Sequence, residues 1–182
     1  QGPYLEWCAG KGHLGRLVSL GHRRIAMSNG PGALTFALLR RQGFMQGLAA
    51  AGIDVAGCPA VHCELTAHAA LAAAIDLLNP ADRSQRPTAL VCANDVLALG
   101  AAMACRQTGL RVGKDVSITG YGNSEAAEFA DPPLTTVDHQ VVESGGHLAE
   151  LLLRRMAGED PAQLHVLEPV RLIERASIAP PL

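Results

Sequence analysis

Short apolar runs alternate with longer helix-patterned segments along most of the chain, and this alternation limits its fold more than any other feature. The first unit joins strand-like residues 24–28 to a helix over 34–51, and further units of the same kind follow. Strand–helix–strand units close as parallel strands with right-handed crossovers, which leaves helices on both faces of the sheet. The sequence therefore predicts an α/β fold with a doubly wound parallel sheet.

Hydrophobic periodicity and capping residues predict the other elements. Thr66 and the pair Asn94-Asp95 stand where helix N-caps belong, and Gly52 and Gly109 stand where helices end. The predicted strands are 55–63, 88–93, 115–121, 134–138 and 164–175, and the predicted helices are 66–78, 96–108, 125–129 and 140–157.

The composition excludes several classes of protein. Hydrophobic residues make up 48% of the chain and charged residues 18%, a balance that disordered chains do not have. The most apolar stretch, 67–78, contains His68 and Asp76 and is too short to span a bilayer. The formal net charge is −2 and no Lys/Arg block occurs, which argues against a nucleic-acid surface. We therefore expect no membrane contact and no direct DNA contact by this chain.

The cysteines indicate a reducing compartment. There are 5 of them, an odd number without a CxxC pair, which favours buried thiols over a secreted disulfide framework. Residues 1–15 also lack the apolar core of a signal peptide, so we expect a cytoplasmic location. A metal site is one interpretation of the group Cys58, His62, Cys63 and Glu64, but the spacing of these residues favours a buried strand end. We expect no metal and no cofactor.

One pattern raises a catalytic alternative. The run GNSEA at 122–126 is one residue away from the nucleophile elbow GxSxG, and Asp131 and His139 follow Ser124 in the order of a hydrolase triad. However, the chain is short for that hydrolase fold, and no oxyanion-loop motif precedes Ser124. The favoured interpretation of residues 122–126 is a loop that caps a helix or faces a ligand, so we expect the chain to have no enzymatic activity.

Loops that follow the strands of a doubly wound sheet meet at its carboxyl edge, where such folds bind ligands. Arg40 in the first turns of a helix can grip a polar ligand through its donor fork, or it can be a solvated side chain. Asn94 and Asp95 follow a buried strand, and a cap needs only one of them, which leaves the other for the cleft. The run Gly-Pro-Gly at 30–32 fits a plain turn better than an anion cradle.

Seven short stretches, each weak alone, form a specific set. They are LGHRRI at 20–25, RxxGF at 40–44, VCAND at 91–95, GLRVG at 109–113, DVSIxGY at 115–121, PPLTT at 132–136 and EPxRLIxR at 168–175. In this order and spacing they resemble the effector-binding core of lactose/galactose-repressor (LacI/GalR) transcription regulators, which is similar to the periplasmic sugar-binding fold. The resemblance covers residues 17–181.

This resemblance implies a function. The chain is expected to be the effector-binding and dimerisation core of a LacI-type repressor, with a sugar or sugar acid as effector. It implies a homodimer, formed in part by helices 66–78 and 96–108 and the segment near Pro132. Operator DNA would be bound only through a headpiece that this chain lacks. A periplasmic-type sugar-binding protein of a transporter is the alternative, and a Ser124 hydrolase is less favoured.

The resemblance also implies how the chain is divided. Residues 24–133 with 164–182 correspond to the C-terminal effector-binding subdomain. Residues 1–23 correspond to the remnant of an N-terminal-subdomain helix, and residues 134–163 to a crossover that belongs to that subdomain. Since most of the N-terminal subdomain has no counterpart here, we expect a chain truncated at its N-terminus. The apolar stripe of helix 140–157 would then lack its usual sheet.

Several positions are implied as ligand contacts. Arg40 and Asn94 match contact positions of the family. Phe36 and Leu34 stand where the family commonly has small polar or charged residues. Leu65 falls roughly at the position where the family often has an aromatic residue that stacks on the ligand. The family usually has an aspartate after Gly-Tyr, where this chain has Gly122, so the pocket is less polar than a typical sugar site. The predicted ligand-binding residues are Arg40, Asn94, Phe36, Leu34, Leu65, Gly122 and Asp95.

Overall fold

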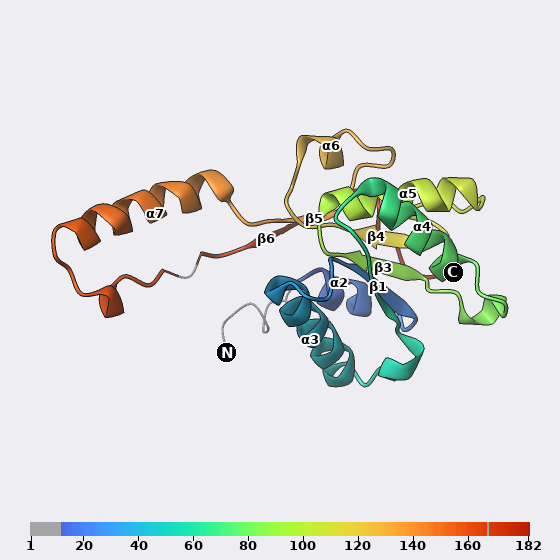
Figure 1. Cartoon of the computed structure of the whole chain (residues 1–182). Coiled ribbons are helices and arrows are strands. Elements are labelled where there is room, and N and C mark those ends of the chain that lie inside the picture. Colours follow the sequence, from blue (N-terminus) through green and yellow to red (C-terminus); the bar gives the residue numbers. More distant parts are fainter. Residues whose placement is uncertain (1–11, 167) are drawn as a thin grey trace.

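The computed structural model describes residues 12–166 and 168–182, and a four-stranded parallel sheet forms its centre (Figure 1). The strands stand in the order β2-β1-β3-β4, and each neighbouring pair is parallel. Their bounds are β1 (Ile25–Asn29), β2 (Ala60–His62), β3 (Ala89–Cys92) and β4 (Ser117–Thr119). The expected α/β fold with a parallel sheet is confirmed.

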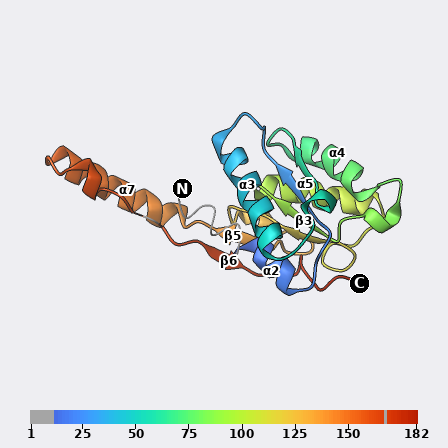
Figure 2. The same cartoon turned by 90° about the horizontal axis from the view of Figure 1, so that it is seen from below.

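Helices cover both faces of the sheet (Figure 2). On one face, α2 (His13–Ser19) and α3 (Thr35–Ala50) pack in a buried cluster that includes Ile25 and Met27. On the other face, α4 (Ala67–Leu78) and α5 (Asp95–Gln107) pack in a second cluster that includes Ala26. Successive strand residues point to opposite faces, and β1 is buried on both, so its run IAMSN contains no charged residue.

The long helices begin where capping chemistry places them. Thr66 Oγ1 accepts a hydrogen bond from Ala69 N at 3.2 Å and starts α4, and Asn94 Oδ1 accepts one from Leu97 N at 2.8 Å and starts α5. The two helices approach closely because Gly100 has no side chain. A Cβ at that position would collide with the carbonyl oxygen of Ala67.

Residues 136–173 form an arm that leaves the main body, and the chain returns to the sheet after it, where Ile118 N donates to Ser177 O. The entry to β5 (Thr136–Asp138) extends the sheet, since Gly120 N donates to Thr135 O at 2.9 Å. β5 then pairs antiparallel with β6 (Arg171–Ile173). At the end of this ribbon, α7 (Val141–Met156) stands away from the sheet in both views (Figures 1 and 2). We call β5, α7 and β6 with their connections the arm.

The exposed side chains of α7 include many large apolar residues. Val142 is 85% exposed, Leu148 68% and Met156 75%. This agrees with the apolar stripe expected from the sequence, and no residue of α7 is buried. The remaining short elements are α6 (Glu125–Glu128), η2 (Val55–Gly57), η3 (Arg83–Gln85) and η4 (Pro161–Gln163).

Three strand predictions are too long. The expected strand 164–175 is ordered as a strand only over β6, because its partner β5 is equally short and Pro169 has no N–H for a ladder. Residues 55–63 form η2 and then the short β2, since Pro59 interrupts the run. The strand expected over 115–121 covers only β4.

The division of the chain into subdomains stays a prediction. Residues 1–11 of the segment 1–23 lie outside the described residues. The described part of that segment contains α2, whose Leu14 and Leu17 are buried against α3 and the sheet. In the described part of the chain, no helix is long and apolar enough to cross a membrane.

Candidate functional site

The loops after the four parallel strands meet at one edge of the sheet. The chain runs from β1 outward to β2 and then returns to β3 on the other side of β1, so the order of strands switches between β1 and β3. Open α/β sheets form their ligand crevice at such a switch point. Residues of the predicted site come from each loop: Leu34 lies between β1 and α3, Leu65 follows β2, Asn94 follows β3 and Gly122 follows β4.

Arg40 is the centre of this edge. Its Nη1 donates to the carbonyl oxygen of Ala93 at 2.8 Å. The guanidinium carbon lies 4.5 Å from the centroid of the Tyr121 ring and 5.1 Å from that of Phe36. Two aromatic contacts and a hydrogen bond hold the flat cation in place at low conformational cost. The half-buried Arg40 is therefore a fixed group at the mouth of the switch point rather than a solvated side chain.

His13 lies beneath Arg40 and is buried. Its Nδ1 is 3.3 Å from the carbonyl oxygen of Gly120. The pKa of His13 is lowered to about 4, mainly by burial; the hydrogen bond with the Gly120 carbonyl raises this pKa, and the positive charge of Arg40 contributes to lowering it. At neutral pH the imidazole is therefore neutral and adds no second positive charge beside Arg40. A small pocket between these groups is lined by His13, Arg40, Tyr121 and the apolar side chains of Leu14, Met27 and Phe44.

Phe36 and Leu65 form an apolar wall next to Arg40. Both converge on Gly30, where a Cβ would lie 2.9 Å from Phe36 Cζ and 3.0 Å from Leu65 Cδ2. The glycine thus lets the two side chains close over the end of β1. Leu34 precedes α3 and is 40% exposed at the same edge. Leu34 N donates to the carbonyl oxygen of Pro31 at 3.0 Å, so the Gly-Pro-Gly run leads into a turn.

Asn94 and Asp95 have separate roles. Asn94 Oδ1 caps α5, and the described residues supply no hydrogen-bond partner for its Nδ2. Asp95 is buried, and its carboxylate accepts hydrogen bonds from Ser124 N at 2.7 Å and from Thr136 Oγ1 at 2.5 Å. Asp95 therefore ties the loop after β4 to β5, and Asn94 is the member of the pair with donor groups left for a ligand.

Gly122 has a backbone reason to be glycine. Its φ is +131°, which side chains rarely adopt, and a Cβ would lie 3.5 Å from Asp95 Oδ2. An aspartate here would be strained and would face another carboxylate. The departure from the family pattern at this position therefore has a structural cause, whatever the ligand is.

The Ser124 alternative finds no support in the geometry. Ser124 has a φ of −69° and its Oγ caps α6 by accepting from Ala127 N at 3.3 Å. The strained residue of a nucleophile elbow is the nucleophile itself, but here the positive φ belongs to Asn123. In the described part of the chain, no hydrogen bond joins Ser124 to His139, whose ring instead stacks on Tyr121.

The four cysteines within the described residues are buried or half-buried free thiols. Burial raises the pKa of Cys58 and Cys63, and Cys63 Sγ donates to the carbonyl oxygen of Asn29. Burial raises the pKa of Cys92 well above the usual range of a thiol and that of Cys105 to about 12. No group of three or more potential metal ligands occurs within residues 12–166 and 168–182.

Three residues of this edge are not predicted as ligand contacts by the sequence. In the sequence, Tyr121 is only part of a motif, and His139 is only the histidine of a possible triad. His13 has no signal beyond its place in a short helix. The Tyr121 and His139 rings stack with centroids 5.1 Å apart and planes inclined by 22°. These contacts join loops that are distant in the sequence, so periodicity could not find them.

Residues 14–178 match the family model described as a periplasmic binding protein-like domain. A similar curated protein is the HTH-type transcriptional regulator CelR of Thermobifida fusca, 36% identical over 158 residues, which are 87% of this chain and 44% of CelR. The chain thus spans less than half the length of this relative.

Two solved structures are similar over nearly the whole chain. A LacI family transcriptional regulator from Bifidobacterium animalis subsp. lactis has a TM-score of 0.86 at 31% identity, covering 98% of this chain and 63% of that one. The lac repressor dimer bound to operator and the anti-inducer ONPF has a TM-score of 0.83 at 30% identity, covering 97% and 59%.

Proposed function

Since the chain belongs to the periplasmic binding protein-like family, we propose that it forms the effector-binding and dimerisation part of a LacI-type transcriptional repressor. The similar proteins that support this are named transcriptional regulators, which makes the transport-protein alternative less supported. The protein acts by binding rather than by catalysis. Its place is the cytoplasm, and operator DNA is bound through a separate headpiece.

The fixed position of Arg40 at the switch point is the main observation behind this proposed function. A guanidinium held by Tyr121, Phe36 and the Ala93 carbonyl at the switch point is suited to bind an oxygen-rich ligand. Asn94 Nδ2 adds donors on the neighbouring loop, and Phe36 with Leu65 adds an apolar wall. The positive charge of Arg40 favours a sugar acid or small polyol over a neutral hexose.

Signal transmission uses the two halves of the family fold. The effector binds in the cleft between them and shifts the population toward one relative angle, which is relayed to the DNA-binding part. In this chain the arm, residues 134–163 above all, belongs to the second half. α7 is therefore proposed to pack against the other subdomain through the apolar side chains that it exposes here.

The proposed dimer face lies on α4, α5 and the segment near Pro132. The structure brings the last two of these together, because a surface hollow is lined by Ala102 and Arg106 of α5 and by Asp131 and Pro132. Met103 on the same helix is 50% exposed. The small residues of α4 and α5 permit close approach of a second copy.

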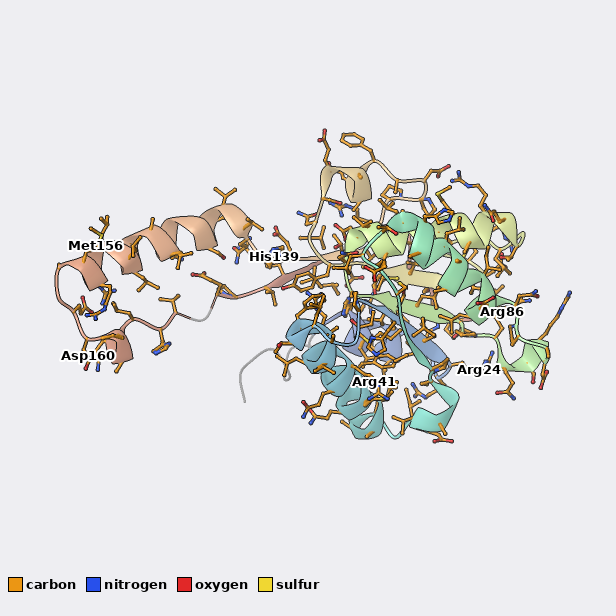
Figure 3. All side chains as sticks on the ribbon, viewed as in Figure 1. Arg24, Arg41, Arg86, His139, Met156 and Asp160 are labelled. Atoms are coloured by element: carbon orange, nitrogen blue, oxygen red, sulfur yellow. The ribbon has the colours of Figure 1, made fainter. Side chains whose placement is uncertain are left out.

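Isothermal titration calorimetry of the complete product of the reading frame tests this function. The panel contains D-gluconate, D-galacturonate, glycerol and D-glucose. We expect a sugar acid or polyol to bind most tightly. Arg40→Ala should weaken binding by roughly 10- to 100-fold, as expected for hydrogen bonds to a charged group. Arg41→Ala is the matched control, because Arg41 is the exposed neighbour on α3 (Figure 3). Tight D-glucose binding that is indifferent to Arg40→Ala would contradict the proposed site.

A further inference from the structure

A hollow at the amino edge of the sheet lies apart from the proposed effector site. Its lining residues include Arg24 before β1, Arg86 and Thr88 before β3, Asp115 before β4, and Arg83 of η3. The amino ends of parallel strands lie at the edge opposite to the ligand-binding loops. Figure 3 labels Arg24 and Arg86 on the side of the body away from the arm. The described lining of the hollow includes none of the predicted ligand-binding residues.

The hollow carries positive charge that the nearby acidic side chains do not balance. In the described part of the chain, Arg24, Arg83 and Arg86 form no ion pair. Asp115 is the acidic side chain on the rim, but it already accepts from Arg111 Nε at 2.8 Å and from Arg111 Nη2 at 2.9 Å. These hydrogen bonds hold the pKa of Asp115 well below its usual range, so the pair is ionised and internally neutral. The positive potential of three guanidinium groups remains.

Two of these guanidinium groups are held by backbone carbonyls. Arg24 Nε donates to the carbonyl oxygen of Arg86 at 3.1 Å, and Arg86 Nε donates to that of Leu78, at the end of α4, at 2.8 Å. Among residues 12–166 and 168–182, the terminal nitrogens of either group have no hydrogen-bond partner. Asp82, which caps η3, accepts from Ser84 N and Ser84 Oγ instead. The terminal nitrogens are thus held in place and left for an anion from solution.

The size and lining of the hollow favour a small phosphate-bearing molecule. Its volume is about 240 Å³, which admits a small molecule. A doubly charged phosphate group matches three guanidinium groups better than a single carboxylate does, and it accepts their hydrogen bonds in bidentate geometry. Pro87, Leu110 and Leu182 add apolar surface beside the arginines, where the organic part of such a molecule can pack.

We propose that this hollow binds the phosphate group of a small phosphorylated molecule through Arg24, Arg83 and Arg86. The site goes beyond the proposed function, because it lies at the other edge of the sheet and needs no effector. The bound phosphate connects η3 to the segments that enter β1 and β3, which are separate in the sequence. Since it binds only the folded chain, it stabilises the fold and raises Tm.

Isothermal titration calorimetry of this chain with phenyl phosphate, a phosphate monoester with an apolar part, tests the site at constant ionic strength. We expect saturable binding to a single site. Arg83→Gln should weaken it at least about fivefold. The substitution spares the fold, because the Arg83 side chain forms no hydrogen bond within the described residues. Arg41→Gln is the matched control, since it removes the same charge from the exposed surface of α3. Asp115→Asn should tighten binding at least about twofold by removing the negative charge on the rim, which a loss of folding could not do.

Three results of this titration would overturn the proposal. They are absence of saturable binding by the unsubstituted chain, equal weakening by Arg83→Gln and Arg41→Gln, and loss of binding in Arg40→Ala instead, which would place the phosphate in the effector site. Tighter binding of poly-L-glutamate than of phenyl phosphate, at equal concentration of negative charge, would overturn it as well and would indicate a surface for an acidic protein. The sugar panel does not enter this experiment, so none of these results counts against the proposed function.

Discussion

Gly122 and Asp95 show how a single residue pair shapes the binding edge. Asp95 uses its carboxylate to hold Ser124 and Thr136, and Gly122 turns at a φ of +131° beside it. These hydrogen bonds to Asp95 thus hold the loop after β4 in place. This leaves Arg40 and Asn94 as the groups that we propose to face the ligand.

Gly122→Asp is expected to destabilise the protein. The substitution combines a strained backbone with a carboxylate near Asp95 Oδ2, which together should cost about 2–4 kcal/mol of the free energy of unfolding. Gly109→Asp is the control, because its φ of +73° is left-handed but nothing lies within 4 Å of its Cβ position. Urea denaturation of both variants measures the difference. Equal stability of the two variants would show that the contact with Asp95 is unimportant.

The lowered pKa of His13 predicts that the folded protein loses stability in mild acid. Its pKa is about 4 in the folded protein, whereas that of an exposed histidine is 6.5. As the pH falls between these values, the unfolded chain binds a proton that the folded chain does not, so the free energy of unfolding decreases. The loss can reach about 3 kcal/mol.

The control for this pH dependence is a variant series. His13→Asn should flatten the decline between pH 6.5 and 4, whereas His68→Asn, at an exposed position of α4, should not. The buried His22, whose pKa is also lowered by burial, remains in both variants and leaves a residual slope. Urea denaturation at a series of pH values measures it. An identical slope in His13→Asn and the unsubstituted protein would count against the buried neutral His13.

At the scale of elements, two glycines in helices have opposite roles. Gly100 sits where α5 touches α4, and an added methyl group would collide with the backbone of Ala67. Gly145 lies in α7 with nothing within 4 Å of its Cβ position. Helix propensity alone would make alanine better at both positions.

We expect Gly100→Ala to lower the free energy of unfolding by about 1–3 kcal/mol through overpacking. Gly145→Ala should raise it, or raise the helicity of α7, by an amount worth about 0.5–1 kcal/mol. Urea denaturation followed by circular dichroism measures both effects. If Gly100→Ala proves stabilising, the close approach of α4 and α5 is not what limits this position.

Elements were predictable from sequence where local chemistry determines them. Thr66 and Asn94 are caps in the structure, and α4 and α5 begin next to them. The strand predicted over 164–175 failed because strand length depends on a partner, and β5 pairs over only three residues. The same distinction holds for the site. Pattern and resemblance predict Arg40 and Asn94 at the carboxyl edge of the sheet, but the stack of Tyr121 with His139 is a tertiary contact that no local pattern encodes.

At the scale of the whole molecule, the exposed apolar surfaces predict self-association. Met103 is half exposed on the proposed dimer face, and Leu148 is 68% exposed on α7. Light scattering of the chain at tens of micromolar should give a mass above that of a monomer. Met103→Glu should weaken the dimer, whereas Leu148→Glu should remove the less specific association through α7. A monomeric mass for the unsubstituted chain would refute this prediction.

At the same scale, we propose that this chain senses a ligand on behalf of a DNA-binding protein. The most direct measurement is fluorescence anisotropy of the complete product on a duplex selected from a randomised pool, with and without the tightest ligand of the panel. We predict sequence-specific DNA binding whose affinity the ligand changes at least about tenfold. In Arg40→Ala the DNA affinity should be retained and the ligand response lost, while Arg41→Ala should behave like the unsubstituted protein. Absence of specific DNA binding by the complete product, or a ligand response that survives Arg40→Ala, would contradict the account.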